Sequence, residues 1–172
     1  MVAVANSDAE IQQYLTFMLA QEEYGVDILT VQELRGWEDT TPIPNTPSFV
    51  LGVINLRGVV IPIVDLRDRF GLEKIEYGPT TVVIIVKVQA DGKERVLGIV
   101  VDAVSEVYDI AQKDMQPPPE MDGAISIDFV TGLATMNEKM VILLDINKLV
   151  TEGVLSNKSR TSPGADVASD KG

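Results

Sequence analysis

Residues 52–66 read GVINLRGVVIPIVDL, and residues 132–146 read GLATMNEKMVILLDI. Both stretches begin with glycine, pass through a turn-like centre into an apolar run, and reach an aspartate thirteen residues after the glycine. A short apolar run that follows a turn and ends at a polar residue is typical of a strand in a hairpin. The two stretches therefore predict two copies of one hairpin unit, although β-rich sequences also match each other by chance.

A second pair of stretches repeats in alternation with the first. Residues 24–34, YGVDILTVQEL, match residues 97–107, LGIVVDAVSEV, at a glycine, a valine and a glutamate. The offset is 73 positions in this pair and 80 in the first. Two separate matches in the same order favour an internal duplication, and they predict two related β subdomains.

The remaining apolar runs are also short and β-rich, and Gly, Pro, Asp or Asn bound them. Asp91-Gly92 predicts a hairpin turn, whereas the proline-rich stretches 41–49 and 116–120 cannot be central strands. Residues 28–34 suit either a short helix or a strand. Short strands at this spacing fit small closed or half-closed barrels, which leave few exposed edges. We therefore expect a mainly β fold of two small antiparallel β-barrels packed on each other.

The composition limits the possible functions. The chain has 172 residues, the size of one ordinary domain, and its net charge of −12 opposes binding to nucleic acid or to an anionic membrane. It contains no cysteine and no histidine, which excludes disulfides, zinc sites built on those residues, and catalysis by a histidine base or a cysteine nucleophile.

The ends of the chain differ in character from its centre. The first residues lack the features of a signal peptide, and no apolar run approaches the roughly 20 residues of a membrane span. We expect a cytoplasmic protein with a flexible N-terminal arm at 1–11, one domain of two barrels at 12–150, and a flexible polar tail at 151–172.

Carboxylates are the only abundant titratable groups, and two of them end apolar runs. Asp65 and Asp145 occupy equivalent repeat positions, each directly before a short predicted helix. A helix cap explains both better than a catalytic acid, although a carboxylate-based enzyme and a ligand-binding barrel stay open as alternatives. No phosphate-binding loop or calcium loop is present in the sequence, so we expect no cofactor and no metal.

Arg57 stands alone in the most apolar part of the chain, at the tip of the hairpin in residues 52–66. It is either a solvated turn residue or a contact for a partner, since arginine is enriched in interfaces. Glu33 is most simply a solvated charge. If it lies near Arg57, the two side chains form an ion pair at the mouth of a groove.

The whole of residues 12–150 resembles the CheW family of chemotaxis coupling proteins. The resemblance rests on EEYGVDILTVQELRG (22–36), NTPSFVLGVINLRGVVIPIVDLR (45–67), VLGIVVDAVSEV (96–107) and MVILLDINKLV (140–150). It implies two intertwined five-stranded SH3-like β-barrels with short helices. It also implies a non-catalytic adaptor that couples the histidine kinase CheA to the cytoplasmic tips of methyl-accepting receptors, in arrays that contain further CheW copies.

The resemblance assigns roles to particular positions of this sequence. Receptor coupling falls to Val31, Glu33, Gly52 and Arg57. The kinase-facing region falls on the middle strands, at Thr81, Val82, Val83, Val100 and Val101. Residues 116–129, where the match to the family is weakest, correspond to contacts between neighbours in the array.

Overall fold

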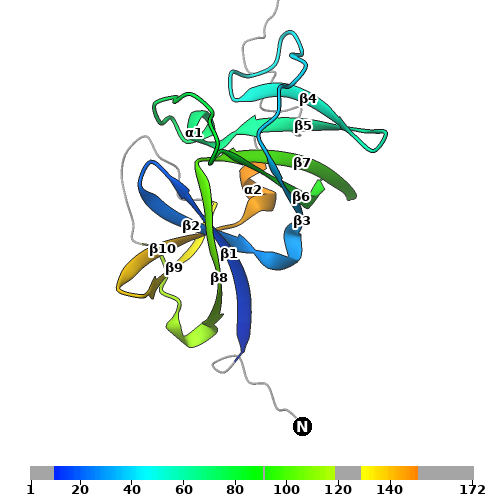
Figure 1. The fold of residues 1–172 in the computed structure, drawn as a ribbon. Helices are drawn as coiled ribbons and strands as arrows, with labels where there is room; N and C mark the ends of the chain where they lie inside the picture. Colours follow the sequence, from blue (N-terminus) through cyan, green and yellow to red (C-terminus); the bar gives the residue numbers. More distant parts are fainter. Residues whose placement is uncertain (1–9, 91, 119–128, 151–172) are drawn as a thin grey trace, which may run out of the picture.

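The computed structural model describes residues 10–90, 92–118 and 129–150, which form two five-stranded sheets (Figure 1). The predicted tail at 151–172 lies outside these residues, as do residues 1–9 of the predicted arm and residues 119–128 of the predicted array segment. The first sheet has the order β8-β1-β2-β10-β9 and contains β1 (Ile11–Leu19), β2 (Glu22–Asp27), β8 (Ala103–Ala111), β9 (Val130–Met136) and β10 (Lys139–Leu144). The second has the order β3-β6-β7-β5-β4 and contains β3 (Val31–Gly36), β4 (Val50–Leu56), β5 (Val59–Asp65), β6 (Val82–Ala90) and β7 (Lys93–Val101).

Helices are short, and each follows a strand directly or after one residue. The α-helices are α1 (Leu66–Arg69) and α2 (Ile146–Val150), and the 3₁₀ turns are η1 (Ile28–Thr30) and η2 (Gln112–Asp114). Residues 28–34, which the sequence left ambiguous, divide between η1 and β3. The side chain of Asp27 accepts a hydrogen bond from the Leu29 amide at 2.9 Å and thereby starts the 3₁₀ turn.

The predicted duplication is visible in the strand pairing. Gly25 of β2 pairs with Leu143 of β10, and Gly98 of β7 pairs with Ile63 of β5. A Cβ atom at Gly98 would lie 2.8 Å from Ile63 Cδ1, and one at Gly25 would lie 3.0 Å from Leu143 Cδ2. The matched glycines therefore serve the same purpose in both halves, which is close approach to a large neighbour.

One detail of the predicted barrels is wrong. We expected antiparallel strands throughout, but β2 with β10 and β5 with β7 are parallel pairs. Parallel neighbours need a long connection between them. The chain supplies it because strands far apart in the sequence come together at the centre of each sheet.

Equivalent bridges bring the opposite edges of each sheet together. Thr41, which follows edge strand β3, exchanges two backbone hydrogen bonds of 2.9 Å with Val53 of edge strand β4. Gln116, which follows β8, does the same with Leu133 of β9 at 2.8 Å. The predicted fold class, mainly β with two five-stranded SH3-like units, is confirmed.

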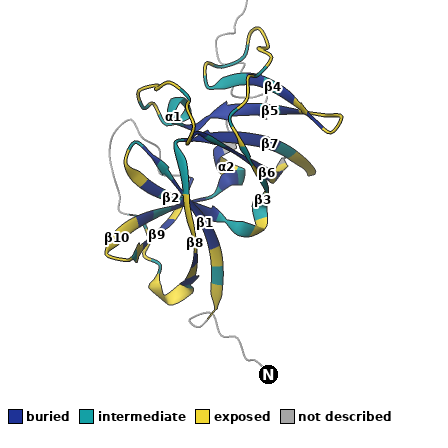
Figure 2. Ribbon diagram, in the orientation of Figure 1, coloured by how far each residue is buried: buried dark blue, intermediate teal, exposed yellow. Residues whose placement is uncertain are grey.

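Three apolar clusters hold the fold together, and Figure 2 shows the buried residues along the central strands. The largest cluster draws on both sheets and includes Phe17 and Val26 from the first and Ile84 and Ile99 from the second. A second cluster lies within the second sheet and a third within the first. The large shared cluster packs the two sheets against each other.

An ion pair also ties the two sheets together. Arg67 of α1 donates from Nε and Nη2 to the two carboxylate oxygens of Asp102, each at 2.8 Å. Asp102, between β7 and β8, also accepts from the Ala20 amide at 2.9 Å in the β1–β2 turn. The Arg67 side chain is 13% exposed and the Asp102 side chain 21% exposed, so this ion pair lies largely out of water.

The hairpin turns contain residues with positive φ angles, and some of these residues are not glycine. Gly92 has φ 75°, as its predicted turn requires, whereas Asn137 and Glu138 between β9 and β10 have φ 53° and 66°. A left-handed conformation suits Asn and Gly but costs roughly 1 kcal/mol at other residues.

Glu138→Gly is therefore expected to stabilise the protein by about 0.5–1 kcal/mol, because Asn-Gly is the preferred pair for this turn. Urea unfolding of the full chain measures the change. Glu94→Gly, in β7 and next to its turn, is the control and should destabilise instead. A loss of stability in Glu138→Gly would contradict the assignment of strain to this turn.

Candidate functional site

The two predicted charges, Glu33 and Arg57, meet in the structure. Glu33 of β3 accepts a hydrogen bond from Arg57 Nη2 through Oε1 and from Arg35 Nη1 through Oε2, the latter at 3.1 Å. Arg35 also contacts Glu38 at 3.1 Å. One carboxylate thus joins two arginines, and the network connects edge strand β3 with the tip of the β4–β5 hairpin.

The hairpin holds Arg57 in a fixed place. Arg57 and Gly58 have φ 52° and 86°, and the Asn55 side chain accepts from the Gly58 amide at 2.9 Å. The Arg57 side chain is 65% exposed and has no partner besides Glu33 among the described residues. Its remaining N–H groups are therefore free to bind another molecule.

A β-bulge directs Glu33 to its position. The register of β3 against β6 shifts between Val31, which pairs with Val86, and Glu33, which pairs with Ile85. Because Val86 and Ile85 point to opposite faces, Val31 packs on the shared core while Glu33 faces the other side. Simple alternation along the sequence would have placed both side chains on one face.

Exposed apolar residues are the chain neighbours of these charges in β3 and in the β4–β5 hairpin, although alternation points Leu34 to the opposite face of β3 from Glu33. Leu34 of β3 is 47% exposed, and Val59 and Val60, which follow the hairpin tip, are 55% and 63% exposed. Apolar side chains beside an arginine of fixed position are typical of a protein-binding surface. We call the set Leu34, Glu33, Arg57, Val59 and Val60 the hairpin surface.

The ion network lowers the pKa of Glu33. The hydrogen bond from Arg57 contributes most, followed by that from Arg35. With a lowered folded pKa, the pair stabilises the fold above the unfolded pKa of Glu, about 4.3, and this contribution is lost as pH falls through the folded value.

We expect Arg57→Ala to raise the pKa of Glu33 towards its ordinary value. Carboxylate-detected NMR titration of the full chain measures it, with Arg95→Ala as a control because Arg95 is exposed on β7, away from the network. An unchanged Glu33 titration in Arg57→Ala would show that the ion pair does not persist in solution.

Gly52 is buried and does not reach the hairpin surface. It has φ 142°, and a Cβ atom there would lie 2.2 Å from the Thr41 carbonyl oxygen. The residue therefore permits the Thr41 bridge, and any effect on a partner acts through the backbone. Its assignment to receptor coupling stays a prediction.

The five residues of the predicted kinase-facing region belong mostly to the interior. Thr81, Val83, Val100 and Val101 are at most 5% exposed, and only Val82 is partly exposed. Alternation along β6 and β7 places the four valines in the two apolar clusters on either side of the sheet. A partner at this region would have to touch Val82 or neighbouring exposed positions.

Asp65 and Asp145 cap helices, as predicted. Asp65 accepts from the Arg67 amide at 3.0 Å, and Asp145 accepts from the Lys148 amide at 3.2 Å. Asp65 is 2% exposed and its other oxygen accepts from the Tyr77 hydroxyl at 2.6 Å. Desolvation and this hydrogen bond raise the pKa of Tyr77. Among the described residues, no cluster of three or more His, Cys, Asp or Glu could hold a metal ion.

Known proteins resemble this chain over most of its length. The model of the CheW-like domain matches residues 13–154. The chemotaxis protein CheW of Klebsiella aerogenes is 46% identical over 140 residues, which cover 81% of this chain and 82% of that protein. The CheW of Rhizobium meliloti is 36% identical over 138 residues, covering 80% and 86%.

A solved structure agrees with the fold. The scaffolding protein TtCheW from Thermoanaerobacter tengcongensis aligns with a TM-score of 0.72 and 38% identity, covering 81% of this chain and 92% of that one. The residues matched by the family model, 13–154, contain all of the strands of both sheets except the first two residues of β1. The chain belongs to the CheW family of chemotaxis proteins.

Proposed function

We propose that this protein is a non-catalytic adaptor that couples the histidine kinase CheA to the cytoplasmic tips of methyl-accepting chemotaxis receptors. The observation that carries the proposal is the ion pair of Glu33 with the exposed Arg57, which connects edge strand β3 with the tip of the β4–β5 hairpin in a member of this family. The two strand-end carboxylates support a non-catalytic role, because both are used as helix caps.

The hairpin surface suits a helical receptor tip. Leu34, Val59 and Val60 offer apolar contact, which provides most of the affinity for an amphipathic helix. The free N–H groups of Arg57 would bind polar groups of the helix and fix its register, since charged contacts at an interface add specificity and a faster association rate.

The proposed location is the cytoplasm, at receptor arrays on the inner face of the membrane. In the described part of the chain, no helix is long and apolar enough to cross a membrane. Recruitment would then depend on the receptors and on neighbouring copies in the array, where high effective concentration compensates for weak single contacts.

Arg57→Ala is expected to abolish most receptor-dependent activation of CheA while changing the stability by no more than about 0.5 kcal/mol. The measurement is kinase activity in reconstituted membranes that contain receptor, CheA and the purified variant. Arg95→Ala is the matched control and should behave as the unmodified protein.

Two outcomes separate the parts of this proposal. Wild-type activation by stable Arg57→Ala would remove the hairpin surface as the receptor contact. Failure of the unmodified protein to bind either a CheA fragment or a receptor fragment in a pull-down would reject the adaptor function itself.

A further inference from the structure

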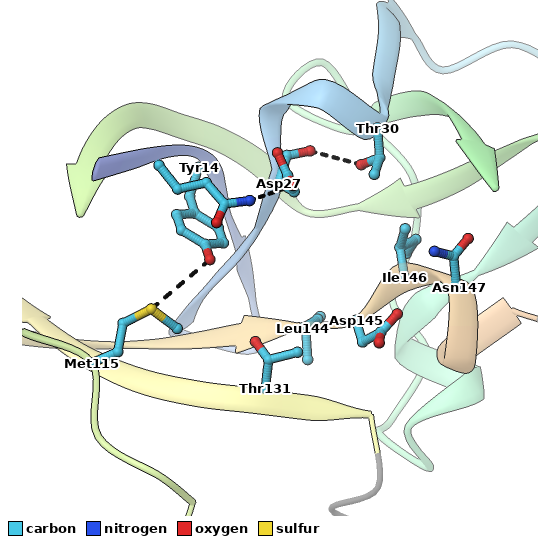
Figure 3. Close-up of a pocket in the computed structure, with 10 residues that line it drawn as sticks. Tyr14, Asp27, Thr30, Met115, Thr131, Leu144, Asp145, Ile146 and Asn147 are labelled. Carbon is cyan, nitrogen blue, oxygen red and sulfur yellow. Dashed lines mark hydrogen bonds between the residues drawn. The ribbon is translucent and has the colours of Figure 1, made fainter. Parts of the chain in front are cut away.

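The first sheet has a cavity at each end of its β2–β10 pair. One opens between β1, the end of β2 and the start of α2 (Figure 3). Its Asp27 carboxylate accepts hydrogen bonds from the Gln12 side chain and the Leu29 amide. Its Tyr14 hydroxyl contacts the Met115 sulfur at 4.0 Å. The polar groups of this cavity therefore have partners within the described residues and do not call for a ligand.

The second cavity, of about 320 Å³, opens at the other end of the pair, between the β1–β2 turn and the start of β10. Two carboxylates, one ammonium, one amide and two thioethers line it, from Glu22, Glu23, Lys139, Gln21, Met18 and Met140. Two negative charges against one positive charge favour a cation. The cavity belongs to the first sheet, so it is separate from the hairpin surface and does not rest on the proposed adaptor function.

Glu23 points towards the interior of the first sheet. It pairs with Met18 of β1 and with Val141 of β10, and residues opposite each other in neighbouring strands point to the same face. Val141 is fully buried in the apolar cluster of this sheet, which also contains Tyr108. Glu23 itself is 5% exposed. Its carboxylate therefore lies beside this cluster and largely out of water.

The buried Glu23 carboxylate lacks a partner. Its Oε2 atom receives no hydrogen bond from any residue that the structure describes. Lys139 also lines the cavity, but it is exposed and forms no ion pair with Glu23. Burial of a carboxylate without a partner is costly, and a bound cation would offset that cost.

Tyr108 lies near Glu23 but cannot neutralise it. Burial raises the pKa of Tyr108 most, and the hydrogen bond to Glu106 raises it further. The hydrogen bond from Asn137 lowers this pKa, whereas the negative charges of Glu23 and Glu106 raise it. The single hydroxyl hydrogen of Tyr108 is already donated to Glu106, at 2.9 Å. The carboxylate of Glu23 is thus left for another donor.

The β1–β2 turn that borders the cavity is held in place. Ala20 and Gln21 have φ 52° and 72°. The Ala20 amide donates to the Asp102 carboxylate at 2.9 Å, and the same carboxylate is held by Arg67. The cavity is therefore formed before a ligand arrives, which lowers the entropic cost of binding.

The lining residues suit an organic cation better than a metal ion. Calcium takes about six to eight oxygen ligands, and no group of three or more His, Cys, Asp or Glu in the described part of the chain could hold a metal. A guanidinium group is more weakly hydrated than an ammonium group, and its planar N–H donors match a carboxylate. The flexible thioethers of Met18 and Met140 suit an apolar chain attached to it.

We propose that this cavity binds a guanidinium group on a short apolar chain. The guanidinium donates to Oε2 of Glu23, and the apolar chain lies against Met18 and Met140. An arginine side chain of another protein and a small alkylguanidine both carry this group, so the two sources share the chemistry that the cavity recognises.

NMR titration of the full chain with butylguanidinium tests the site. We expect a saturable shift of the Glu23 and Val141 backbone amide signals and no shift at Gly58. Butylurea, which has a similar shape and no charge, should not bind. Glu23→Gln should weaken binding by about tenfold or more, because a hydrogen bond to a charged group is lost. Glu94→Gln, which removes an exposed charge from β7, is the matched control and should change binding by less than about twofold.

A second titration distinguishes the two sources of the ligand. It uses acetyl-arginine methylamide, in which the guanidinium is attached to a peptide backbone. Binding as strong as that of butylguanidinium would support an arginine side chain of another protein. Binding of butylguanidinium alone would support a small molecule, because the peptide groups would not fit at the mouth of the cavity.

The melting temperature provides an independent measurement with a predicted sign. Because the free protein buries the Glu23 charge without a partner, Glu23→Gln should raise the melting temperature of the full chain. Butylguanidinium should raise the melting temperature of the unmodified chain and leave that of Glu23→Gln unchanged. Lys139→Gln should strengthen binding, because it removes a positive charge from the lining of the cavity.

Three results would overturn the proposal. The first is a shift of the same amides by butylguanidinium that persists unchanged in Glu23→Gln, and the second is an equal shift with butylurea. The third is a lower melting temperature in both Glu23→Gln and Lys139→Gln. That result would show that Lys139 pairs with Glu23 in solution and leaves no site for an external cation.

Discussion

Gly52→Ala is expected to lower the free energy of unfolding by about 3–5 kcal/mol, from the strained backbone and two lost hydrogen bonds. The residue has φ 142°, a region that residues other than glycine rarely adopt, and the new Cβ atom would lie 2.2 Å from the Thr41 carbonyl oxygen and 2.7 Å from its carbon. Relief of this clash must move backbone and break the paired bonds between Thr41 and Val53. Urea unfolding measures the loss.

Gly36→Ala is the matched control, because a Cβ atom at Gly36 meets nothing within 4 Å and the change should stay within about 0.5 kcal/mol. A stability of Gly52→Ala close to that of the unmodified protein would contradict the close approach of Thr41.

The prediction also bears on receptor coupling. A Gly52 variant with weak coupling would reflect a damaged edge of the second sheet, so coupling must be compared at equal amounts of folded protein.

Asp102→Ala is expected to destabilise the fold by about 2–4 kcal/mol, because it removes one partner of a largely buried ion pair. In the variant, the Arg67 guanidinium would keep only its hydrogen bond to the Glu73 carbonyl oxygen, which is 2.6 Å long in the unmodified protein. The Ala20 amide would lose its acceptor. The exposed pair Lys87–Glu94, at 3.3 Å, provides the control, and Glu94→Ala should cost less than about 1 kcal/mol. Equal effects of the two changes would contradict a special role for Asp102.

The same ion pair predicts a dependence on pH. Burial alone would raise the pKa of Asp102, but hydrogen bonds from Arg67 and the Ala20 amide outweigh it and lower the pKa. The contribution of Asp102 is therefore complete above its unfolded pKa of about 3.9 and is lost as pH falls through the lower folded value. The stability difference between Asp102→Ala and the unmodified chain should shrink in acid.

The sequence predicted the fold well because the duplication leaves local signals. The glycine, turn and aspartate of residues 52–66 and 132–146 correspond to β4–β5–α1 and β9–β10–α2. Strand direction was the error, since local patterns carry no information on which distant strand lies alongside. The parallel pairing of β5 with β7 depends on contacts between complete strands.

The site was predictable only in part. A resemblance to a family pointed to Glu33 and Arg57, but their contact depends on the bulge in β3, which has no clear signal in the sequence. The ion pair of Arg67 with Asp102 was missed because it joins residues 35 positions apart from different elements. The burial of Val83 and Val100 was likewise invisible, since both faces of a central strand carry apolar residues.

The order of strands has a consequence for synthesis of the protein. The second sheet uses the continuous residues 31–101, whereas the first combines 11–27 with 103–144. When synthesis has passed β7, all strands of the second sheet are present, whereas the first sheet consists only of the β1–β2 hairpin. An isolated hairpin is marginally stable in water. The β1–β2 hairpin is thus synthesised first, but its sheet is completed last. The free edge of β2 stays unpaired until β10 has been made. A chain that stalls after β8 would expose that edge, at which premature pairing with another nascent chain would begin.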